Sequence, residues 1–77
     1  MFQFAFTVCV FLYPNPQPID CGNMAAKRER WETTRERCEE AMATTTEQLA
    51  EQITAYYLRR GAMPAVVFLN KHCLEIT

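Results

Sequence analysis

The chain opens with a strict alternation of apolar side chains and smaller or polar ones. Large apolar side chains occupy every even position of the first twelve, namely Phe2, Phe4, Phe6, Val8, Val10 and Leu12, and Gln3, Ala5, Thr7 and Cys9 stand between them. A period of two in residues that favour extended backbone is typical of a half-buried β-strand. The pattern therefore predicts a strand over residues 2–13 that gives one apolar face to the core.

Prolines follow this strand at alternate positions, as Pro14, Pro16 and Pro18. Proline removes a backbone donor and biases the residue before it toward extended geometry. We therefore predict that the strand ends by Tyr13. Residues 14–22 are predicted to form a semi-rigid, polyproline-like connector.

A long stretch of helix-forming residues comes next, without glycine or proline until Gly61. Asn23 is a good N-cap before it, and we predict a helical body over residues 24–60. The most regular part is an apolar stripe at helical spacing from Leu49 to Tyr57, which Gly61 ends.

The three threonines at positions 44–46 raise the question of one helix or two. Thr44 and Glu47 have the spacing of a capping box, which favours a new helix start. The apolar stripe nevertheless runs in phase through the threonines, as one continuous helix requires. Because a helix over residues 24–60 would be about 55 Å long, we predict a break at 44–46 and a helical hairpin, with one long helix as the alternative.

The end of the chain contains a second strand signal. The apolar run from Ala65 to Leu69 predicts a strand over residues 65–69, bounded by Pro64 and Asn70. Asn70 either starts a tight turn into a further strand or caps a helical turn, within a short C-terminal element at 71–76. The predicted fold is α+β, a single small domain in which a long N-terminal strand and short C-terminal strands pack against the helical body. Because a two-stranded sheet has exposed edges, we also predict a homodimer.

The charges are nearly balanced but unevenly placed. Eight basic and nine acidic residues give a net charge of −1, and most of them lie between Lys27 and Glu51. Between Lys27 and Glu40, five cations stand among five carboxylates, so the field that a nucleic acid would feel is largely cancelled. The apolar start is far shorter than the ~20 residues of a membrane-spanning helix, and it lacks the basic residues of a signal peptide. We therefore predict no membrane association and a cytoplasmic location.

The four cysteines lack the close spacing of metal-binding pairs, so we predict neither a metal nor another cofactor. In the cytoplasm thiols stay reduced, and we predict buried free thiols at Cys9, Cys38 and Cys73. Cys21 precedes the predicted helix start, where the helix dipole favours a thiolate, so a small thiol enzyme is one alternative function. The single histidine, His72, adjoins Cys73 on a predicted strand and faces the other way. We predict no catalytic residues.

These features favour a non-enzymatic protein-binding module. Arginine and tyrosine are enriched at interfaces, and the surface cations are not needed by the predicted core. The predicted partner-binding residues are Lys27, Arg28, Arg30, Arg35, Arg37, Tyr57, Arg59 and Arg60. The expected setting is a small phage or mobile-element inhibitor or adaptor that acts on a host protein or protein complex, for example as an anti-CRISPR. A small nucleic-acid-binding or transcription-regulatory protein is the other alternative.

Overall fold

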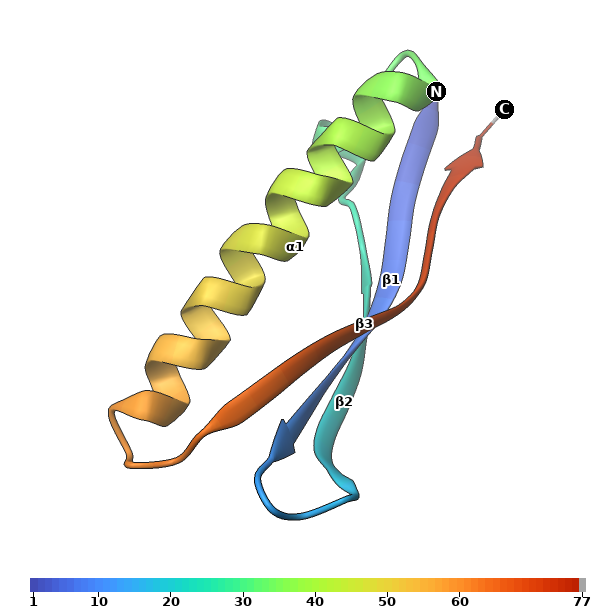
Figure 1. The fold of residues 1–77 in the computed structure, drawn as a ribbon. Coiled ribbons are helices and arrows are strands. Elements are labelled where there is room, and N and C mark those ends of the chain that lie inside the picture. Colours follow the sequence, from blue (N-terminus) through green and yellow to red (C-terminus); the bar gives the residue numbers. More distant parts are fainter. Residues whose placement is uncertain (77) are drawn as a thin grey trace.

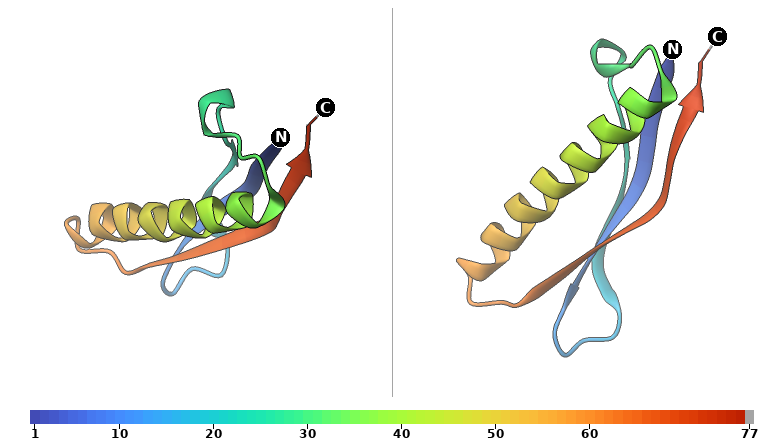
Figure 2. Two further views of the ribbon diagram at one scale, coloured as in Figure 1. Left: turned by 90° about the horizontal axis from the view of Figure 1, so that it is seen from above. Right: turned by 45° about the horizontal axis from the view of Figure 1, so that its top comes forward.

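A computed structural model describes residues 1–76. Strand β1 spans Phe2–Leu12, β2 Pro18–Ala25 and β3 Pro64–Glu75, while the short 3₁₀ turn η1 spans Arg28–Arg30 and helix α1 Arg35–Leu58. The strands form one antiparallel sheet in the order β2-β1-β3, and α1 lies along one face of it (Figures 1 and 2). The predicted α+β fold is thus confirmed, with the N-terminal strand at the centre of the sheet.

The alternating side chains of β1 build the core as predicted. Phe4 and Phe6 point toward α1 and are almost fully buried, and they form one cluster with Ala26 and Cys38. The Phe6 ring meets the Phe68 ring of β3 edge-on, with 5.4 Å between centroids. The even positions of β1 therefore face the helix, and its odd positions face away.

Strand β2 replaces most of the predicted connector. Its residues pair with β1 from Pro18, opposite Phe11, to Ala25, opposite Ala5. The predictions of a connector through residue 22 and of a helix start at Met24 are therefore wrong. Proline and glycine are tolerated here because β2 is an edge strand. Asn23 does not cap a helix, because its Oδ1 accepts a hydrogen bond from Thr7 Oγ1 at 2.7 Å across the strand pair.

Helix α1 is continuous through the three threonines. The predicted break is wrong, and the alternative of one long helix holds over Arg35–Leu58. Thr34 caps the true start by accepting a hydrogen bond from the backbone N–H of Arg37 at 3.2 Å. Thr46 donates to the carbonyl of Ala43 within the same helix. A helix of this length spans about 36 Å, which a twelve-residue strand of about 40 Å can support.

Strand β3 merges the two predicted C-terminal elements. It pairs with β1 from Pro64, opposite Leu12, to Glu75, opposite Phe2. The strand predicted over residues 65–69 is confirmed beside β1. Asn70 has a positive φ of 54° and lies where the register against β1 shifts, so it forms a bulge, with neither a turn nor a helix cap.

The four cysteines form two disulfides, so the prediction of free thiols is wrong. Cys9 and Cys21 sit directly opposite each other on β1 and β2, with Cα atoms 4.1 Å apart. Cys38 of α1 is bonded to Cys73 of β3. Because Cys21 lies within a strand, the helix start on which the thiol-enzyme alternative rested does not exist there. That alternative loses its structural basis.

Candidate protein-binding groove

Helix α1 covers only part of its side of the sheet. It packs against β3 and β1, while all eight residues of β2 are exposed. Two of the β2 residues that face the helix side are small or polar: Gly22 pairs with Val8, and Asp20 pairs with Val10. An open groove therefore remains between α1 and β2, with β1 as its floor. We call it the α1–β2 groove.

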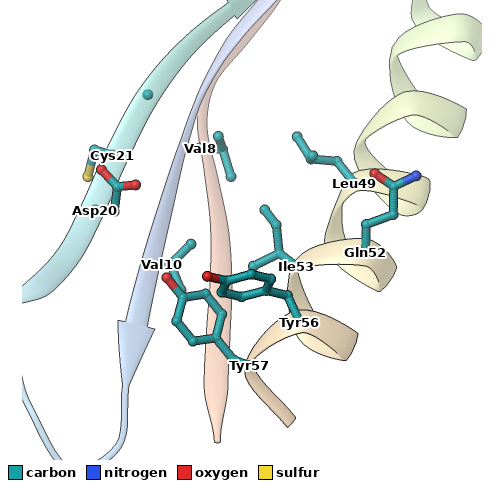
Figure 3. Close-up of a pocket in the computed structure, with 10 residues that line it drawn as sticks. Val8, Val10, Asp20, Cys21, Leu49, Gln52, Ile53, Tyr56 and Tyr57 are labelled. Atoms are coloured by element: carbon teal, nitrogen blue, oxygen red, sulfur yellow. The ribbon is translucent and has the colours of Figure 1, made fainter. Parts of the chain in front are cut away.

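Beside the C-terminal half of α1, the groove contains a hollow of about 360 Å³, and Figure 3 shows the residues that line it. Its lining comprises Val8 and Val10 from β1, Asp20, Cys21 and Gly22 from β2, and Leu49, Gln52, Ile53, Tyr56 and Tyr57 from α1. A second hollow of about 320 Å³ continues along the same junction toward η1, lined by Phe4, Phe6, Met24, Ala25, Ala26, Lys27, Arg30 and Thr45. The walls are mostly apolar, with charged groups near the ends and a single carboxylate between them.

Two tyrosines form the aromatic end of the groove. The rings of Tyr56 and Tyr57 meet edge-on with 5.1 Å between centroids, and both lie beside Ile53 and Val10 (Figure 3). The Arg60 guanidinium lies 3.6 Å from the centre of the Tyr56 ring and also donates to the Tyr56 carbonyl at 3.0 Å. Tyr56 is about half exposed, and partly exposed aromatic rings that pack on their neighbours are typical of residues that anchor an interface.

Several predicted partner-binding residues lie at the two ends of this groove. Lys27 and Arg30 line the end near η1, and Tyr57 lines the other, with Arg60 next to it. Arg59 forms the exposed C-cap of α1. The two clusters are separate in the sequence, and the groove connects them.

The remaining predicted cations are placed differently. Arg28 lies over the Trp31 ring at 6.0 Å, and Arg35 lies over the Phe2 ring at 5.2 Å. Arg35 also donates to the Cys73 carbonyl at 3.3 Å, so it helps to hold α1 on the sheet. Arg37 is exposed near the start of the helix. These three residues lie outside the lining of the groove.

The β2 wall of the groove is not predicted from the sequence. The pattern places Asp20 and Gly22 in the connector, and Val8, Leu49 and Ile53 in the core. The available signal is the pair of small or polar residues at alternate positions, Asp20 and Gly22, followed by Met24. On an edge strand, small or polar residues at alternate positions give a helix no apolar surface to pack on, so that part of the sheet face stays uncovered.

No protein family, characterised protein or solved structure shows significant similarity to the chain. Among residues 1–76, no group of three or more His, Cys, Asp or Glu side chains is placed to hold a metal ion. Within the same residues, no helix is both long and apolar enough to cross a membrane.

Proposed function

We propose that the chain is a non-enzymatic protein-binding module that holds an apolar segment of another protein in the α1–β2 groove. The observation that carries this proposal is an apolar groove with an aromatic end, left open because β2 has no helix over it. Interface cores are enriched in tyrosine and poor in charge, as this lining is. Its helix wall, from Thr45 to Tyr57, extends about 18 Å along α1, which suits a segment of polypeptide.

The charges of the groove indicate the kind of segment that fits. Lys27 and Arg30 lie at one end and Arg60 at the other, while Asp20 is the carboxylate between them. A segment with an apolar centre and acidic residues toward both ends matches this arrangement. Exposed ion pairs contribute at most about 1 kcal/mol each, so apolar contacts supply most of the affinity and the charges fix the orientation.

The proposed setting is that of a small inhibitor or adaptor of a phage or another mobile element, acting on a host protein or protein complex. An anti-CRISPR protein is one such inhibitor. A domain of 77 residues with one binding groove is sufficient for an inhibitor that acts by covering a functional surface of its partner. This setting is supported by size and by the groove alone.

The proposed action on a host complex requires a cytoplasmic location, and in the cytoplasm thiols are normally kept reduced. Two disulfides are more typical of an oxidising compartment. The thiol state in the source cell tests the location: alkylation in denaturant at the moment of lysis, which reaches buried thiols such as Cys38, should label all four cysteines if the chain is cytoplasmic. Absence of labelling until a reductant is added would place the chain in an oxidising compartment.

Filling the groove should abolish partner capture. A Cβ atom added at Gly22 would meet nothing within 4 Å, so a side chain can start there, and Gly22→Trp directs a large ring toward the groove. We expect affinity capture from host lysate, read by mass spectrometry, to lose the partner at least ~10-fold with this variant. The fold should be retained, because replacing a strand glycine does not lower β propensity.

The matched control is Gln17→Trp, which adds the same side chain at an exposed loop position outside the groove. It should capture the partner as the unmodified chain does. Equal capture by a folded Gly22→Trp variant would contradict the proposal.

The nucleic-acid alternative has one structural observation in its favour. Lys27, Arg28 and Arg30 in and next to η1 lie at the same end of the molecule as Arg35 and Arg37, the start of α1 (Figure 1). Binding of DNA or RNA that survives Gly22→Trp and falls steeply with salt would support this function, because phosphate contacts release counterions.

A further inference from the structure

The face of the sheet that points away from α1 is uncovered (Figure 2). It is formed by the odd positions of β1 from Gln3 to Phe11 and by their pairing partners on β2 and β3. We call it the open face. Val67, Leu69 and Leu74 of β3 are 38%, 46% and 56% exposed on it.

The open face carries no Asp, Glu, Lys or Arg at any of these paired positions. The charged residues of the strands lie on the other side: Asp20 pairs with Val10, and Glu75 pairs with Phe2. Lys71, next to the bulge, lines a hollow between β3 and α1. A solvated sheet face normally carries polar and charged side chains, so the absence of charged ones from these positions is unusual.

Several polar side chains of the open face already have a hydrogen-bond partner within the chain. Gln3 Nε2 donates to the Ala26 carbonyl at 2.8 Å, and Thr7 is bonded to Asn23 at 2.7 Å. The His72 Nδ1 lies 2.7 Å from the Asn70 carbonyl. A polar group that is already bonded can be covered without the free-energy cost of an orphaned donor or acceptor. These bonded atoms therefore add little to the free-energy cost of covering the face.

We infer that a second copy of the chain covers the open face, so that two sheets pack face to face in a symmetric dimer. A surface without charge is complementary to itself, because the two-fold contact buries no unpaired ion and brings together no like charges. A foreign partner selected by charge would find nothing to recognise here. This contact differs from the edge pairing predicted from the sequence, because the copies meet through side chains and not through backbone.

The size of the open face is sufficient for a specific contact. Three strands about 4.8 Å apart, with about nine residues of 3.3 Å each, give a face of roughly 14 by 30 Å. Two such faces bring together about 840 Å² in projection, and side-chain relief raises the buried area toward ~1,000 Å², which is the lower limit for a specific interface. The α1–β2 groove lies on the opposite side of the sheet and stays free in this dimer.

The test is the oligomeric state of the full chain in sedimentation and native mass spectrometry. We expect a particle of twice the 9.0 kDa chain mass. Leu69→Lys places a charge at the centre of the contact and should raise the dimer dissociation constant at least ~100-fold, because an unpaired buried charge is costly. Leu74→Lys, near the end of the same strand, should act in the same direction.

Leu58→Lys is the matched control, since Leu58 is 52% exposed on α1 and lies away from the open face. It should leave the dimer intact. Circular dichroism of each variant separates lost association from lost folding. A monomeric unmodified chain at several hundred micromolar would overturn the inference, as would folded Leu69→Lys and Leu74→Lys variants that remain dimeric.

Discussion

Removing the Cys38–Cys73 disulfide, by Cys38→Ala together with Cys73→Ala, is expected to lower the free energy of unfolding by about 4 kcal/mol. The bond joins residues 35 apart in sequence and ties α1 to β3, and Cys38 is completely buried. Its loss frees a long loop in the unfolded chain. For a domain of this size we expect the midpoint of thermal unfolding to fall by roughly 15–30 °C, as measured by circular dichroism.

The matched control is removal of the Cys9–Cys21 disulfide by Cys9→Ala with Cys21→Ala. This bond spans only 12 residues between strands that also pair through their backbones. The expected loss is about 3 kcal/mol, so this variant should melt at the higher temperature of the two. If this variant instead melted at the lower temperature, the β1–β2 pair would depend on its disulfide more than the attachment of α1 to β3 does.

Phe6→Ala should cost about 3–5 kcal/mol of stability. Phe6 is 3% exposed, packs against Phe4 and Phe68, and belongs to a core with few fully buried residues. Because small domains have a total stability of about 5–15 kcal/mol, this single change should remove a large share of the stability. Chemical denaturation followed by tryptophan fluorescence measures the loss, since Trp31 packs against the same cluster.

Leu58→Ala provides the comparison, because it removes an apolar side chain that is half exposed on α1. Its effect should stay within about 0.5 kcal/mol. Similar losses for Phe6→Ala and Leu58→Ala would contradict the position of the core between β1 and α1.

The elements predicted correctly are those whose signal is local. The alternation in residues 2–12, the stripe from Leu49 to Tyr57 and the run from Ala65 to Leu69 each specify a structure within a few turns or pleats. Strand β2 has no comparable signal, because Pro18 and Gly22 lie in it and its formation depends on hydrogen bonds to β1. The error at the helix start follows from this: both Asn23 and Thr34 are good caps, and pairing of β2 with β1 decides between them.

The candidate site could be predicted only in its parts. The cations at Lys27 and Arg30 and the aromatic Tyr57 were identified as partner-binding candidates, and the apolar floor and helix wall were assigned to the core. The groove itself results from the angle and reach of α1, which leaves β2 uncovered. Such a gap is a property of the assembled layers, and no residue pattern reports it. The disulfides were missed for a similar reason, since strand register brings Cys9 to Cys21.

The central position of β1 also determines the order in which the fold can be completed during synthesis. β1 is made first, and β2 can pair with it at once through a short hairpin, whereas β3 follows only after α1. Until β3 arrives, the second edge of β1 has no partner strand. Contacts between distant segments form slowly, so this interval is the stage at which the nascent chain is most exposed to pairing with a strand from another molecule.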